Sequence, residues 1–100
     1  NIDLPNPEEA LANPDGMELP SRPDQIYVLG AAILNLITRD CTTEKWHAAG
    51  KVLEKIVAAG HPDMAVSFAR QWLKLRPSTE TPNSKVLQSL IPLLTEAKLI

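Results

Sequence analysis

The chain has 100 residues, of which 44% are hydrophobic and 22% charged, and its formal net charge is −2. This length predicts one domain, and the ordinary balance of apolar and charged residues argues against intrinsic disorder. The small net charge gives no basis for strong attraction to DNA or to an anionic membrane.

The charges are unevenly distributed along the chain. Residues 1–40 carry seven acidic and two basic side chains, whereas residues 41–100 carry five acidic and eight basic ones. Two interpretations stay open: an acidic arm lying along a mildly basic helical body, or a chance imbalance in a short chain. Chance is the simpler of the two.

Residues 1–22 are punctuated by prolines and are expected to form an arm with one short helix. Asn6-Pro7-Glu8-Glu9 is a typical helix start, with an asparagine cap, proline at the first position and acids in the first turn. Asn13-Pro14-Asp15-Gly16 ends this helix within two turns. Leu11 is the side chain that such a helix would bury.

The segment Ser21–Gln25 starts a second helix, which is expected to run to about Arg39. Apolar residues recur in it at spacings of three and four: Ile26, Leu29, Ile33, Leu36 and Ile37. Tyr27, Val28, Ala31 and Leu34 add apolar surface on other sides. Because a helix that is apolar nearly all round is buried on several sides, we expect it to be the central helix of a bundle.

Three further helices are expected: from Thr42 or Thr43 to a cap at Gly60, from Pro62 to before Pro77, and from about Ser84 onwards. A loop at residues 77–82 separates the last two, and Pro92 should kink or break the final helix. No stretch alternates with period two, so no strands are expected. The prediction is therefore an all-α fold, a small bundle of four main helices plus a short N-terminal helix in antiparallel hairpins, with an arm at 1–22 and the bundle at 23–100.

Residues suited to catalysis or metal binding are scarce. His47 and His61 have no cysteine or paired carboxylate at ligand spacing, and the single cysteine, Cys41, could pair with His47 but has nothing nearby to activate it. Glycine-rich phosphate-binding motifs and Asp-rich loops are missing from the sequence. We therefore expect no catalytic, cofactor-binding or metal site in this chain.

A basic cluster formed by Arg70, Lys74 and Arg76 is the candidate interaction surface, for an acidic protein or for nucleic acid. Arg70 and Lys74 stand one turn apart on one helix face. A solvated helix face is the commoner explanation for such a cluster, and no aromatic residue lies among the bases to stack with nucleotides. Nucleic acid is therefore not the expected partner.

Two short motifs have simpler explanations than the families they suggest. His61-Pro62-Asp63 resembles the tripeptide of J-domain cochaperones, but the sequence lacks the basic helix before it and the loop after it; Gly60 closes one helix and Pro62 opens the next. The helices expected after Thr42 and from Pro62 resemble one tetratricopeptide unit. Its first helix is echoed by Trp46 and Gly50, and its second by Gly60, Ala65, Val66, Phe68, Trp72, Leu75 and Pro77. A lone unit cannot bury its own apolar face, so an ordinary helix hairpin is favoured.

Three segments, taken in order, resemble the C-terminal helical region of MoxR-type AAA+ ATPases. They are Asn6-Pro7-Glu8-Glu9-Ala10-Leu11-Ala12-Asn13-Pro14, then Leu19-Pro20-Ser21-Arg22-Pro23-Asp24-Gln25-Ile26-Tyr27-Val28-Leu29, and finally Met64-Ala65-Val66-Ser67-Phe68-Ala69-Arg70-Gln71-Trp72-Leu73. Residues 40–60 depart from that family's pattern.

The resemblance implies a non-catalytic helical appendage to a chaperone-like ATPase. In such proteins the nucleotide-binding module, with its ATP and Mg²⁺, precedes this region, and the assembly is typically a hexameric ring that remodels partner proteins. None of the family's Walker or arginine-sensor residues map onto this chain. The apolar helix from Pro23 would then pack partly against that missing module, which predicts an exposed apolar patch on the isolated chain.

Two alternatives stay open beside this hypothesis: a free-standing helical adaptor that binds protein through the Trp46 and Trp72 hairpin, and a nucleic-acid-binding module using the basic cluster. The sequence has no initiator Met, which suggests a processed protein or a fragment of a longer one. No signal peptide is visible, and the apolar run Ile26–Leu34 is too short to cross a bilayer. A cytoplasmic location with no membrane partner is therefore expected.

Overall fold

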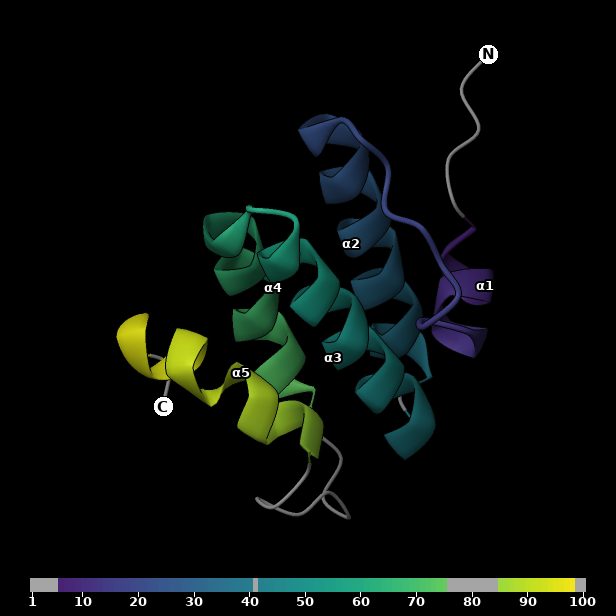
Figure 1. Cartoon of the computed structure of the whole chain (residues 1–100). Helices are drawn as coiled ribbons and strands as arrows, with labels where there is room; N and C mark the ends of the chain where they lie inside the picture. The colour runs from purple at the N-terminus through teal and green to yellow at the C-terminus, as the bar shows by residue number, and fades with distance from the viewer. Residues whose placement is uncertain (1–5, 41, 76–84, 99–100) are drawn as a thin grey trace.

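The chain folds into five α-helices: α1 (Pro7–Ala12), α2 (Pro23–Arg39), α3 (Thr43–Ala58), α4 (Pro62–Lys74) and α5 (Lys85–Glu96) (Figure 1). This computed structural model describes residues 6–40, 42–75 and 85–98, and no strand occurs in those ranges. The prediction of a small all-α bundle with one short and four longer helices is confirmed. The loop expected at 77–82 lies outside the described residues.

The helix boundaries follow from capping residues in the sequence. The Asn6 side chain accepts a hydrogen bond from the Glu8 amide at 2.9 Å, and Thr42 accepts one from the Lys45 amide at 3.2 Å. Proline stands in the first turn of α1, α2 and α4, where its missing N–H leaves no helical bond unmade. Gly60 adopts a φ of 95° after α3, the left-handed conformation that glycine accepts most readily.

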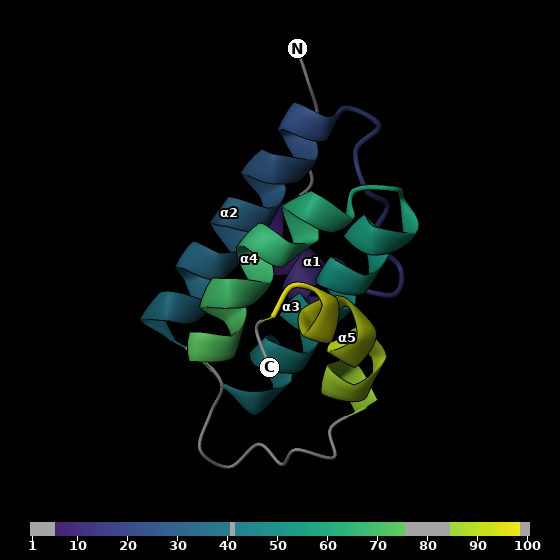
Figure 2. The same cartoon turned by 90° about the vertical axis from the view of Figure 1, so that its left-hand side faces the viewer.

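Helix α3, rather than α2, is the centre of the bundle. α3 contacts all four other helices, whereas α2 contacts α1, α3 and α4, and Figure 2 shows α2, α4 and α5 arranged around α3. The expected central position of α2 is therefore wrong. The reason is side-chain size: Ala48, Ala49 and Gly50 are buried in α3 and let neighbours approach closely, while α2 leaves Tyr27 and Val28 more than half exposed.

Two tryptophans lock α3 to α4. The indole rings of Trp46 and Trp72 stack with centroids 4.1 Å apart and planes 6° from parallel. Trp46 Nε1 donates a hydrogen bond to the Trp72 carbonyl at 2.8 Å, and Trp72 Nε1 donates one to the Trp46 carbonyl at 2.9 Å. Both side chains are 0% exposed, so the pair buries two large rings and satisfies both polar N–H groups at once.

The expected N-terminal arm packs against the bundle over its described residues. α1 contacts α2 and α3, and Ala10 is completely buried in the common hydrophobic core. Leu11, which the sequence suggested as the buried residue, is only half-buried, because the six-residue helix turns Ala10 toward its neighbours. Lys51 pairs with Asp15 at 3.4 Å, a contact that favours an acidic arm lying along a basic body.

Helix α5 continues through Pro92, so of the kink or break expected there, the break does not occur. Its side chains Leu90 and Leu94 are buried against α3 and α4. Proline removes the donor that would bond to the Gln88 carbonyl. Both Gln88 and Pro92 are exposed, so water can reach that carbonyl and burial on the opposite face can hold the helix together.

Gly30 is predicted to be indispensable at the crossing of α2 and α4, because a Cβ atom there would overlap the ring of Phe68. Alanine is the better helix former by about 1 kcal/mol, but overpacking a core typically costs about 1–3 kcal/mol. We therefore expect Gly30→Ala to lower the free energy of unfolding, measured by urea denaturation followed by circular dichroism. Phe68→Leu in the same chain should restore part of the loss. A Gly30→Ala chain as stable as the original would contradict this packing.

Candidate functional site

A large hollow of the described structure is a groove between α1, the end of α2 and the first half of α3. Its volume is about 740 Å³, which is in the range of ligand sites. It is lined by Glu8, Leu11, Ala12, Pro14, Leu36, Arg39, Asp40, Glu44, Lys45, His47, Ala48 and Lys51. We refer to it as the α1–α3 groove.

The groove has an apolar floor and a charged rim of balanced sign. Leu11 from α1 and Leu36 from α2 are half-buried and meet Ala48 of α3 at the floor. Three acidic and three basic side chains stand around them. Two of the bases are engaged in ion pairs, Lys45 with Asp40 at 3.0 Å and Lys51 with Asp15 at 3.4 Å. The groove therefore suits an apolar group more than an ion.

The described side chains that line the groove include His47, Asp40, Glu44 and Glu8. His47 is half-buried at its edge, with its ring centroid 5.8 Å from that of Trp46. Cys41, which the sequence suggested as its partner, lies outside the described residues. Within the described residues no three His, Cys, Asp or Glu side chains gather as a metal site would require. The groove offers shape and apolar surface for binding.

Sequence reasoning did not find this groove. Its lining comes from three segments whose proximity depends on how α1 packs, and Leu36 had been assigned to the core by its spacing in α2. One signal was available: α1 is too short to cover the α2–α3 surface beside it, so a hollow next to α1 could have been anticipated.

A second surface is the outer side of α2, formed by Tyr27, Val28, Ala31, Ala32 and Asn35, which we call the α2 face. Tyr27 is 55% and Val28 52% exposed, and residues 25–38 carry no charged side chain. The Tyr27 ring leans on Phe68 of α4 with centroids 5.3 Å apart. These exposed apolar residues agree with the patch expected from the sequence.

The basic cluster proposed from the sequence is described in part. Arg70 and Lys74 are exposed on α4, one turn apart. Arg76 lies outside the described residues. Next to Arg70, Gln71 Nε2 donates a hydrogen bond to Thr38 Oγ1 of α2 at 3.1 Å. Neither Arg70 nor Lys74 lines the α1–α3 groove.

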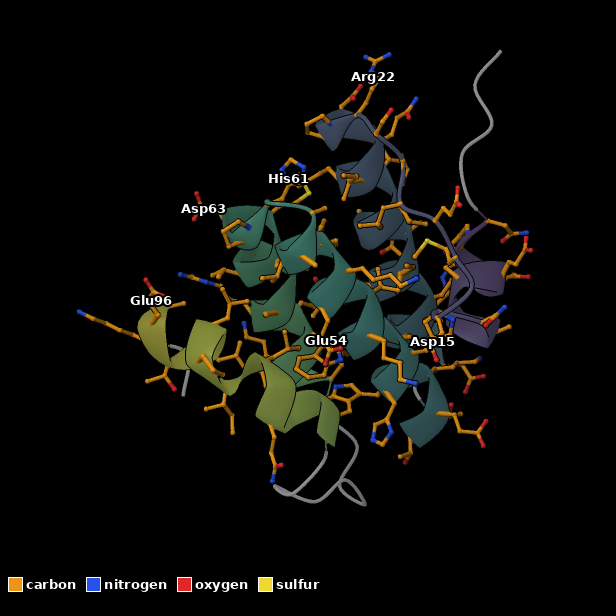
Figure 3. The ribbon with its side chains drawn as sticks, in the orientation of Figure 1. Asp15, Arg22, Glu54, His61, Asp63 and Glu96 are labelled. Atoms are coloured by element: carbon orange, nitrogen blue, oxygen red, sulfur yellow. The ribbon has the colours of Figure 1, made fainter. Side chains whose placement is uncertain are left out.

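The structure argues against two interpretations that rest on short motifs, the J-domain-like tripeptide and the tetratricopeptide-like hairpin. His61-Pro62-Asp63 forms the start of α4, with His61 as its N-cap residue and Asp63 directed outward at the end of the bundle (Figure 3). α4 starts at Pro62 itself, without the loop that follows this tripeptide in J-domains. Trp46 and Trp72 are buried in the core, so an adaptor could not use those side chains as its binding surface.

Comparison of the chain with models of protein families, with curated proteins and with solved structures finds no match. None of the helices described here combines the length and the apolar character that a membrane span requires.

Trp72 is predicted to serve stability rather than binding. Trp72→Ala should lower the free energy of unfolding by about 3–5 kcal/mol, since it removes a fully buried ring. Such a loss is most of the stability of a small domain. Trp72→Phe keeps a buried ring, loses one hydrogen bond and should cost about 1–2 kcal/mol. Urea unfolding followed by circular dichroism measures both; an alanine variant of undiminished stability would show that the stack is dispensable.

Proposed function

We propose that this chain is the non-catalytic C-terminal helical region of a MoxR-type AAA+ ATPase, where it serves packing, assembly or partner contact. The proposal starts from the resemblance of residues 6–14, 19–29 and 64–73 to that region. It is supported by the fold class and by the α2 face. In this arrangement ATP and Mg²⁺ belong to a module upstream, and this chain holds no cofactor of its own.

The α2 face is the observation on which the proposal depends. A helix face that stays in water can carry Lys or Glu at low cost, yet residues 25–38 carry no charge and present Tyr27 and Val28. Contiguous exposed apolar patches, when they are large, mark interaction surfaces in soluble proteins. We infer that the α2 face packs against the upstream ATPase module, in a cytoplasmic and hexameric chaperone-like assembly.

The coding sequence upstream of Asn1 gives the first test. We expect a Walker A motif, GxxxxGK[ST], within about 300 residues upstream. A start codon immediately before Asn1 would overturn the proposal.

Val28→Asp is predicted to separate the two modules in the longer protein. In this chain alone the change should alter the free energy of unfolding by less than about 1 kcal/mol, because Val28 is exposed. Against the upstream module it would bury a carboxylate without a partner, which is strongly unfavourable. We expect limited proteolysis to release the helical region faster from the Val28→Asp protein.

Gln88→Asp is the matched control, because Gln88 is also exposed on a helix and α5 does not contact α2 in the described structure. Equal proteolysis of the Val28→Asp protein and the original protein would rule out the α2 face as the contact.

A second candidate function, a free-standing adaptor that binds an apolar segment of another protein, is favoured by the α1–α3 groove. Its volume and apolar floor suit such a segment. A start codon directly before Asn1 would favour this candidate over the ATPase region.

A further inference from the structure

We propose that residues 6–20, comprising α1 and the segment that follows it, form a latch that opens from the bundle as one unit, with the Lys55 ammonium group as its catch. This inference concerns the regulation of the α1–α3 groove. It stands whether or not the chain belongs to an ATPase.

Two lysines of α3 hold the latch by its backbone and by one carboxylate. Lys55 Nζ donates hydrogen bonds to the Met17 carbonyl at 2.6 Å and to the Asp15 carbonyl at 3.1 Å. Lys51, one turn earlier, donates to the Asp15 carboxylate at 3.4 Å. Hydrogen bonds from a charged donor are stronger than neutral ones, and the short Lys55 contact is partly buried, which protects it from competition by water.

The apolar hold on the latch is weak by comparison. α1 has six residues, fewer than the roughly 12–15 that an isolated helix needs in water. Ala10 is its buried residue, and alanine contributes little apolar surface. Leu11, Met17 and Leu19 add partly buried contacts to the core. Removing the Lys55 contacts should therefore shift the balance toward the open form.

The α1–α3 groove gives α1 room to move on one side. This groove of about 740 Å³ borders Glu8, Leu11 and Ala12. A second hollow of about 200 Å³ is lined wholly by residues of the latch itself, between Asn6 and Glu18, so it would move with the latch. Tight packing on every side would fix the helix in place; here one side borders open space.

The rest of the core does not depend on the latch. Among the described residues α1 contacts α2 and α3 but neither α4 nor α5, and it lies at the edge of the bundle (Figure 1). The Trp46–Trp72 pair joins α3 to α4. Residues 6–20 can thus open while the four longer helices stay packed, as low-stability segments of folded proteins do.

Opening of the latch would change the groove directly, since α1 supplies one of its walls. A molecule that fits the wider groove would favour the open latch. By the same linkage, a mutation that raises the fraction of chains with an open latch would raise the affinity for that molecule by the factor by which it raises that fraction. Loss of the charge on Lys55 would act in the same direction.

Hydrogen exchange in the 100-residue chain tests the latch, with Lys55→Met as the variant, since methionine keeps an apolar stem and removes the ammonium group. We expect the amides of Ala10 and Asn13, which bond to the Asn6 and Glu9 carbonyls, to exchange about tenfold faster or more. The amides of Phe68 and Ala69 in α4 should keep their rates. Lys98→Met, which removes an exposed ammonium group at a position that does not line the groove, should leave the α1 amides unchanged.

Two results would overturn the proposal: unchanged exchange of the α1 amides in Lys55→Met, or an equal acceleration of the α4 amides. The unmodified chain in low concentrations of urea provides a second measurement, which holds even if the variant does not fold. There the Ala10 and Asn13 amides should exchange with a smaller free energy of opening than those of Phe68 and Ala69. Equal free energies would show that the latch does not open separately.

Discussion

The stacked pair of Trp46 and Trp72 is the interaction on which the rest of the structure depends. Each indole donates its N–H to the backbone carbonyl of the other residue, and the rings lie 4.1 Å apart. The geometry is reciprocal, so it fixes the offset of α3 along α4 and the rotation of each helix together. A chain with 4% aromatic residues uses half of them at this one contact, and the aliphatic core is assembled around it.

Fixing α3 against α4 leaves the remaining sides of α3 for the other helices, and this arrangement separates a rigid region from a looser one. On one side lie the tryptophans and α5, anchored by Leu90 and Leu94. On another side lies α1, held through Ala10 and two lysines. The α1–α3 groove lies on the looser side. Binding surfaces bordered by a weakly held element can adapt to what they bind.

The sequence predicted the helices well because their ends are encoded locally. Asn6, Thr42 and Gly60 act within a few residues of themselves, and so do the prolines that open α1, α2 and α4. Which helix is central was not predictable in this way. Apolar periodicity favoured α2, but the decision depended on small residues at 48–50 that let α3 be approached from several sides. The groove and the lysine contacts to Asp15 and Met17 were missed for the same reason, since they join segments distant in sequence.

The two sides of α2 show why an uncharged outer face needs an explanation beyond this chain. Its inner side is closely fitted, with Gly30 placed where any side chain would overlap Phe68. Tyr27 packs its ring against Phe68 and is still 55% exposed. Packing within the chain thus explains in part why an aromatic side chain stands at Tyr27, but it does not explain why an apolar side chain stands at the exposed position of Val28. A charged substitution at the exposed Val28 would improve solubility without disturbing the inner side. A face that avoids charge along residues 25–38 is the pattern expected where water is excluded by a second surface, and this is the physical basis for the proposal that α2 packs against a surface outside the described bundle.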